Sequence, residues 1–424
     1  MNRHIAFIDS NLIGVYALDM AKDMGHAVTF IHSSDIHWYT HNKDYGRIIS
    51  RVDRTIEMET TSDEDALCLI LEKLNKEAPI DAVMTTWEFS IRTIARVCRR
   101  LGLSFTNAKA VEIARDKFLC RQVLALENVP SARCALAADI HAALEAAGDI
   151  GYPVIAKPVS GAASFFARLV HTDEEMQALF DLRAAKLARI PQSLKKDLSR
   201  GMLIEERLKG ELISVEIGMS RGAPVIFMIT GRKCSRENEA LELGAVMPAD
   251  LGATQEAAAE AYALTIVRAL GLDKGIFHIE MMLTPDGPRL IEANPRLMGA
   301  MLPRLYENLS GRSIFQDLIK IHLDEPVAPP PREFPHAAIS HCVAVAEDGA
   351  IPPDYDLSWL EEYRGDLLLF DLPISPGQKV RKLESSEEIF GFMQLKAPDA
   401  RSGQKRAEEI IKRLGRSLGL TMAA

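Results

Sequence analysis

Apolar and polar positions along the first hundred residues follow two different periods, which predicts strands that alternate with helices. Short apolar runs, typical of buried strands, occupy residues 4–8, 27–31 and 80–86. Amphipathic stretches with helical spacing occupy residues 12–24, 64–77 and 91–100. This alternation predicts an α/β unit with a doubly wound parallel sheet. The first turn reads DSNLIG and lacks the G-x-G-x-x-G pattern, which argues against a dinucleotide-binding site.

The pattern changes after residue 106, where strands no longer alternate regularly with helices. Helices are expected over residues 115–129, 138–147, 182–200 and 254–270. Strands are expected near Ala132 and over residues 152–159, 165–171, 202–208, 213–219 and 224–230. Several of these strands follow one another across short turns, so this region is expected to be α+β with antiparallel pairing.

A proline-rich linker, DEPVAPPPREFP, begins at Asp324 and separates the last hundred residues. These contain a short strand, DLLLFDL, and a basic amphipathic helix, KRAEEIIKRLGRSL, which is read as a packed helix and not as a membrane-surface helix. The chain therefore predicts three domains, at residues 1–106, 107–325 and 326–424. The middle one would have two lobes, 107–205 and 206–325, and the last would be a small α+β subdomain.

The stretch HIEMMLTPDGPRLIEANPR, residues 278–296, predicts a hairpin whose turn is centred near Asp286. In that register Glu280 lies opposite Glu292, and His278 lies opposite Asn294. Side chains in a strand alternate between its faces, so Ile279, Met281, Ile291 and Ala293 are expected to share the apolar face.

Two opposed glutamates in a hairpin repel each other unless something lies between them. A hard divalent cation such as Mg²⁺ takes carboxylate oxygens together with substrate phosphates, and it would offset this repulsion. The alternative is a solvated polar face with a slipped register. The hairpin alone leaves both interpretations open.

Composition indicates an ordinary globular chain with 47% apolar residues and a net charge of −9. This balance argues against nucleic acid or an anionic membrane as the main partner. No apolar run approaches the roughly 20 residues of a membrane helix. The six cysteines are scattered without a C-x-x-C pair, which favours reduced thiols and a cytoplasmic location.

Two lysines and one acidic stretch add candidate chemistry. Lys157 lies in the apolar strand VIAKP directly before the small-residue loop SGAAS, which suits a phosphate, although a solvated lysine at a strand end is the more common explanation. Lys117, near the start of its helix, is a weaker candidate. The stretch LIEERLKGELISVE has the extended backbone and carboxylates that an adenine nucleotide needs, or it is an exposed hairpin edge.

The order of these features resembles the ATP-grasp superfamily, over about residues 1–323, and most of all its L-amino acid ligases and related carboxylate–amine ligases. The resemblance rests on six stretches: DAVMTTWEFSIRTIARVCRRLGL, ARDKFLCRQVL, YPVIAKPVSGAAS, LIEERLKGELISVEI, ITGRKCSRENEALELGAVMPADL and GIFHIEMMLTPDGPRLIEANPRLMG. It implies an ATP-dependent ligase that activates a small carboxylate as an acyl phosphate and joins it to an amine. Members are often dimers, so a homodimer is an expectation.

The same resemblance implies the site residues. Those for ATP would be Lys117, Lys157, Ser164, Glu205, Glu206, Arg207, Leu208 and Glu211. The ligands of Mg²⁺ (or Mn²⁺) would be Glu280, Glu292 and Asn294. Arg296 and Lys157 would be the catalytic groups that stabilise the reacting phosphoryl or acyl group.

The sequence departs from the family pattern at two places. The phosphate loop is usually glycine-rich, whereas GAASFFA has one glycine and keeps Ser164. The ribose glutamate usually follows the turn glycine by two residues, where this chain has Leu212, so the neighbouring Glu211 takes that role here.

The substrates are the least defined part of the prediction. Glu88 follows a strand end, where doubly wound sheets bind ligands, and could hold an amino group. Lys233 and Glu242 could line the acceptor side; each of the three could equally form a structural ion pair. Two alternatives to the amine ligase remain: a ligase that uses a carrier-protein thiol or another nucleophile, and a nucleotide-binding module without turnover.

Overall fold

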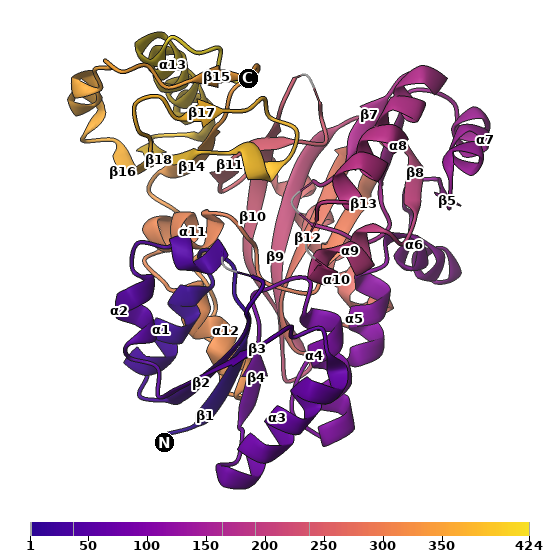
Figure 1. Cartoon of the computed structure of the whole chain (residues 1–424), viewed down its shortest axis with the longest axis vertical. Coiled ribbons are helices and arrows are strands. Elements are labelled where there is room, and N and C mark those ends of the chain that lie inside the picture. Colours follow the sequence, from indigo (N-terminus) through magenta and orange to yellow (C-terminus); the bar gives the residue numbers. More distant parts are fainter. Residues whose placement is uncertain (1, 37, 163, 191, 237, 424) are drawn as a thin grey trace.

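The structure is a computed structural model that describes residues 2–36, 38–162, 164–190, 192–236 and 238–423. Figure 1 shows a parallel sheet near the N-terminus, a long central sheet, a smaller sheet beside it and the C-terminal elements at the other end. No helix of the described residues is long and apolar enough to cross a membrane.

The N-terminal strands form a parallel sheet in the order β3-β2-β1-β4. Along β1 (His4–Ile8), alternate side chains enter two different cores, one covered by α1 and the other by α3 and α4. The predicted doubly wound sheet is therefore confirmed. The remaining elements are α1 (Val15–Asp23), β2 (Ala27–Ser33), η1 (Trp38–His41), α2 (Tyr45–Ile49), β3 (Arg54–Met58), α3 (Glu64–Glu77), β4 (Ala82–Met84) and α4 (Ile91–Leu101).

The second unit is a small antiparallel sheet in the order β5-β8-β6-β7, with α7 packed against it. The predicted helix over 182–200 is divided between the end of α8 and α9, and the predicted strand over 165–171 shortens to β7. The elements are α5 (Ala108–Ala114), α6 (Lys117–Leu126), β5 (Cys134–Ala137), α7 (Ile140–Ile150), β6 (Val154–Pro158), β7 (Arg168–Val170), α8 (Asp173–Leu187), α9 (Gln192–Leu198) and β8 (Met202–Glu206).

The central sheet has eight strands in the order β13-β12-β9-β10-β11-β14-β18-β16, and its pairs are antiparallel. Its last three strands lie beyond the proline-rich linker and extend the same sheet through β11 and β14. The strands are β9 (Glu211–Ser220), β10 (Ala223–Cys234), β11 (Glu242–Met247), β12 (Gly275–Thr284), β13 (Gly287–Asn294), β14 (Ala337–Val343), β16 (Leu367–Asp371) and β18 (Gly391–Ala397).

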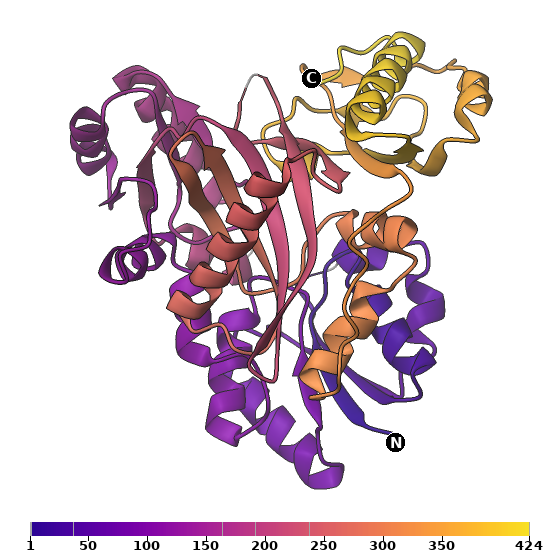
Figure 2. The same ribbon diagram turned by 180° about the vertical axis from the view of Figure 1, so that it is seen from behind.

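Helices cover the two faces of this sheet differently. α10 (Ala253–Leu270) lies across one face, as Figure 2 shows, and packs on the apolar residues of β9 and β12. On the other side, α12 (Ile314–His322) contacts α1 and β12 and so joins the parallel sheet to the central one. The other late elements are α11 (Leu302–Ser310), β15 (Gly349–Ala350), η2 (Ser358–Tyr363), β17 (Lys379–Val380), η3 (Ser386–Glu388) and α13 (Ala400–Leu418).

Candidate active site

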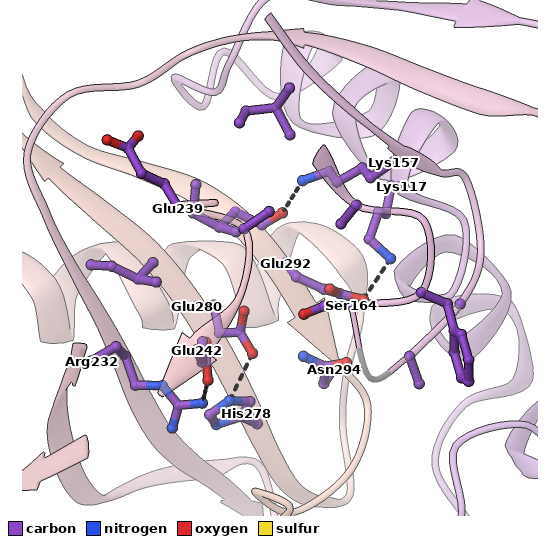
Figure 3. A pocket seen from close by; sticks show the side chains of 18 of the residues that line it. Lys117, Lys157, Ser164, Arg232, Glu239, Glu242, His278, Glu280, Glu292 and Asn294 are labelled. Carbon is purple, nitrogen blue, oxygen red and sulfur yellow. Dashed lines mark hydrogen bonds and ion pairs between the residues drawn. The ribbon is translucent and has the colours of Figure 1, made fainter. Parts of the chain in front are cut away.

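All of the predicted site residues except Glu211 and Lys233 line one cavity. It lies on the face of the central sheet opposite α10 and is also lined by residues of the small sheet and by Glu88, which follows β4 of the parallel sheet. Figure 3 shows several of its side chains from close by. Its ionisable lining consists of Glu88, Glu205, Glu206, Glu239, Glu242, Glu280, Glu292, Lys117, Lys157, Arg207, Arg232, Arg296 and His278. Acidic and basic side chains therefore face the same cavity.

The predicted hairpin is confirmed in both turn and register. β12 and β13 close at the pair Thr284 and Gly287, and Glu280 pairs with Glu292. A bulge next to Glu280 shifts the register, so Met281 pairs with Leu290. Leu290 therefore enters the apolar core.

The predicted placement of Ile291 on the apolar face is wrong for the same reason. The extra residue of the bulge turns Ile291 toward the cavity, which it lines. Its carbonyl oxygen accepts hydrogen bonds from Arg121 Nη2 at 2.9 Å and from Lys157 Nζ at 3.3 Å. The bulge thus holds Lys157, which was predicted to contact ATP, against the hairpin.

Glu280, Glu292 and Asn294 offer three hard oxygen donors on the cavity face of the hairpin. Two carboxylates and an amide oxygen fit Mg²⁺, which usually takes few protein ligands and completes its shell with water and substrate phosphates. Within the described ranges, no larger group of His, Cys, Asp or Glu side chains is arranged to hold a metal. The donor set therefore suits a metal that is shared with a phosphate.

Lys117 is positioned by the start of α6. Asp116 caps this helix by accepting from Leu119 N, and Lys117 N donates to the carbonyl of Val159 at 2.9 Å. The ammonium lies 2.7 Å from Glu292 Oε1 (Figure 3). The helix start thereby places one cation at the carboxylates of the hairpin.

Lys157, at the end of β6, is held by Glu205 of β8. The Glu205 carboxylate lies 2.5 Å from Lys157 Nζ and 2.9 Å from Arg121 Nε. Burial raises the pKa of Glu205, but the two cations outweigh it and hold that pKa below its ordinary value. The Glu205 side chain, predicted to bind ATP, is thus engaged with Lys157 and Arg121, so it positions the lysine.

The end of β8 supplies the remaining nucleotide candidates. Glu206, Arg207 and Leu208 line the cavity where the strand leaves the small sheet. Arg207 Nε lies 2.9 Å from the carboxylate of Glu239, which lies in the segment between β10 and β11. Glu239 was not predicted, because nothing local to its sequence places that segment over the cavity.

The loop after β6 reaches the cavity through Gly161, Ala162 and Ser164, while residue 163 lies outside the described residues. Ser164 and Phe166 both have positive φ values, 54° and 56°. Such backbone is usual for glycine and uncommon for other residues. The loop with one glycine therefore reaches left-handed backbone conformations with non-glycine residues.

Glu88 was predicted to hold a substrate amine, but both of its oxygens face arginines. Oε1 is bonded to Arg115 Nη1, and Oε2 accepts from Arg296 Nε at 2.9 Å and Nη2 at 2.5 Å. Burial raises the pKa of Glu88, and Arg296 and Arg115 together outweigh it and lower that pKa. This carboxylate is charge-balanced and orients the Arg296 fork.

Lys233 does not line the cavity, and this part of the prediction is wrong. Its ammonium pairs with Glu408 of α13 at 2.7 Å, whereas the preceding residue, Arg232, points into the cavity and pairs with Glu242 (Figure 3). Successive residues of β10 point to opposite faces. The prediction chose the wrong one of two adjacent cations.

Glu211 is also misplaced by the prediction. It is exposed at the start of β9 and lies off the cavity, while its neighbour Leu212 lines it. Partial covering of its carboxyl group by neighbouring atoms and the charge of the nearby Asp250 raise the pKa of Glu211. A carboxylate one residue earlier in a strand cannot replace the one that the family pattern expects.

Comparisons with known proteins agree with this geometry. Residues 150–303 match the model of the ATP-grasp domain, and residues 18–104 match that of the ATP-grasp N-terminal domain. Carnosine synthase 1 of Gallus gallus is 28% identical over 303 residues, which is 68% of this chain and 32% of the relative. Alanine–anticapsin ligase of Bacillus amyloliquefaciens is 25% identical over 316 residues, 69% of this chain and 62% of the relative.

The fold has a solved counterpart over its whole length. An L-amino acid ligase from Bacillus licheniformis has a TM-score of 0.76 at 19% identity, and the match covers 99% of this chain and 98% of that one. By contrast, the chain spans between about a third and a half of the length of the first curated relatives that it matches.

Proposed function

Because the chain belongs to the ATP-grasp superfamily, we propose that it is an ATP-dependent ligase that joins an amino acid or another small carboxylate to an amine. The product is a dipeptide-like amide, formed together with ADP and phosphate. The observation that carries this proposal is the opposed pair Glu280 and Glu292, with Lys117 and Lys157 at the same cavity. The names of an L-amino acid ligase and an alanine–anticapsin ligase among the similar proteins support the choice of substrates.

The reaction needs activation because a carboxylate is a poor electrophile at neutral pH. A carboxylate oxygen of the substrate attacks the γ-phosphorus of ATP, and the bond to the ADP oxygen breaks. The amine then attacks the acyl carbon, phosphate leaves with the electron pair of the carbon–oxygen bond, and the amine loses a proton. Positioning and charge stabilisation are the protein's main tasks in such chemistry.

Different residues of the chain perform these tasks, according to where they lie around the cavity. Lys117 and Lys157 bind the phosphates of ATP, and the backbone of Glu206 to Leu208 holds the adenine. Arg296, fixed by Glu88, stabilises the anionic acyl group, and Ser164 contributes to the phosphate loop. Arg232 and Glu242 lie at the same cavity and bind polar groups of the substrates.

Glu280, Glu292 and Asn294 hold Mg²⁺, which when bound neutralises phosphate charge and orients the oxygens. Two carboxylates on one side of a cavity and two ammonium groups beside them fit a metal–triphosphate ligand. Glu292 also keeps Lys117 in place, since its Oε1 lies 2.7 Å from the lysine ammonium.

The test is ADP release with Mg²⁺ and ATP across single amino acids and all their pairs, with the product mass recorded for each active pair. Release that requires two amino acids and gives the mass of their condensation product supports the proposal. Release with one carboxylate alone indicates another acceptor, such as a carrier thiol. ATP binding without release in any mixture contradicts the ligase.

Replacing Lys233 tests whether this cation of β10, and not the adjacent Arg232, acts at the cavity. Lys233→Met is expected to leave kcat and every KM within about twofold of the wild type, because its partner is Glu408 of α13. The loss of this partly exposed ion pair is expected to lower the free energy of unfolding by about 0.2–1 kcal/mol. Steady-state ADP release and urea unfolding measure both quantities.

Arg232→Met is the matched comparison, since it removes a cation from the adjacent, cavity-facing position. It is expected to raise a substrate KM by about tenfold, equal to about 1.4 kcal/mol of lost binding. Equal kinetic effects of the two substitutions would contradict the assignment of the two faces.

A further inference from the structure

Three ionisable side chains form a row across β9 and β12 on the cavity side of the central sheet. Glu216 and His278 are directly opposed in the register of the two strands, and Glu280 follows His278 on the same face. The exposed fractions of Glu216 and His278 are 0% and 3%. Buried carboxylates and a buried imidazole are costly to keep in a sheet unless they are paired.

Both ring nitrogens of His278 are engaged. Nδ1 is hydrogen-bonded to Glu216 Oε1, and Nε2 lies 2.9 Å from Glu280 Oε1 (Figure 3). A ring held at both nitrogens has one fixed orientation. The carboxylate of Glu280 is thereby held at Oε1. Its other oxygen, Oε2, has no hydrogen-bond partner within the described part of the chain and is available to a ligand in the cavity.

The far end of the row reaches the segment that follows Arg296. Oε2 of Glu216 accepts a hydrogen bond from Met298 N at 3.2 Å. His278 N in turn donates to the carbonyl of Arg296 at 3.0 Å. One buried carboxylate and one imidazole thus connect the metal side of the cavity to the backbone that carries its arginine.

We propose that Glu216 and His278 are positioning residues for the metal ligand Glu280. Glu216 fixes the ring of His278, and the ring fixes the rotamer of Glu280 so that its free oxygen meets the metal together with Glu292. The inference rests on the proposed function, because that function supplies the metal. Groups that orient metal ligands in this way typically contribute about 10–100-fold to metal affinity.

The experiment titrates the whole protein with Mn²⁺ in the presence of ATP and follows free Mn²⁺ by electron paramagnetic resonance. His278→Gln is expected to raise the Kd of Mn²⁺ by about 10–100-fold. Glu216→Gln has nearly the same shape and also removes the charge behind the ring, and it is expected to raise that Kd by about tenfold. Turnover at saturating Mg²⁺ should return to within a few fold of the wild type, whereas structural damage would lower it at every metal concentration.

His341→Gln is the matched control, since His341 is 3% exposed on β14 of the same sheet and lies off the cavity. It is expected to leave the Kd of Mn²⁺ unchanged. An unchanged Kd in folded His278→Gln or Glu216→Gln would overturn the inference, as would wild-type protein that binds no Mn²⁺ with ATP. Wild-type protein that binds Mn²⁺ and ATP but forms no amide from any pair would overturn the proposed function and leave the inference standing.

Discussion

Replacing Glu292 by glutamine is expected to lower kcat by about 10²–10³-fold, because this change removes one charge from the pair of opposed carboxylates that we propose to hold the metal. Glutamine keeps the shape of the side chain and an acceptor oxygen for Lys117, which lies 2.7 Å from Glu292. The fold is therefore expected to persist. The measurements are ADP release against Mg²⁺ concentration and the thermal unfolding midpoint.

Glu211→Gln gives the same chemical change at a carboxylate that lies off the cavity. Its kcat and its Mg²⁺ dependence are expected to equal those of the wild type. If folded Glu292→Gln kept normal, Mg²⁺-dependent turnover, the metal assignment of the hairpin would be wrong. Equal losses of kcat in both variants would indicate that these substitutions destabilise the sheet.

The hairpin could be predicted from sequence because its information is local. Pro285, Asp286 and Gly287 define the turn, and the turn fixes which residues face each other. The opposition of Glu280 and Glu292 follows directly. The bulge that turns Ile291 into the cavity has no comparable local signal, since it depends on how β13 packs against α10 and the core.

The errors at Lys233 and Glu211 have one physical origin. Each lies next to the residue that faces the cavity, and each lies just outside the strand expected from the sequence, over 213–219 or 224–230, so the direction of its side chain could not be predicted. Facing along β10 depends on its pairing with β9 and β11, and β11 itself was not predicted. Only the pairing of β10 within the assembled sheet shows that Arg232, and not Lys233, faces the cavity.

Ion pairs between distant segments account for two further differences. Glu88 and Glu205 were recognised as site residues, yet their partners, Arg115 and Arg121, lie elsewhere in the chain.

β3 was missed because an edge strand with exposed polar residues, RTIEM, lacks the apolar run that marks a buried strand. The domain boundaries near residues 106 and 325 remain a prediction.

Arg296→Ala is expected to lower kcat by about 10²–10³-fold while the KM of ATP changes only a few fold. In the proposed mechanism Arg296 stabilises the reacting acyl group, whereas Lys117 and Lys157 contact ATP. The fold tolerates the change because Glu88 keeps Arg115 as a partner after Arg296 is removed. Steady-state kinetics with ATP and the substrate pair separate kcat from KM.

Two further experiments distinguish the contribution of the planar guanidinium group of Arg296 from that of its charge. Arg296→Lys keeps the charge but loses the two-point contact that Nε and Nη2 make with Glu88, so it is expected to recover only part of kcat. Free guanidinium should partly restore turnover to Arg296→Ala. Arg289→Ala, on β13 a few residues before Arg296 and off the cavity, should retain normal kinetics. Normal kcat in folded Arg296→Ala would remove this arginine from the chemistry and leave it as the structural partner of Glu88.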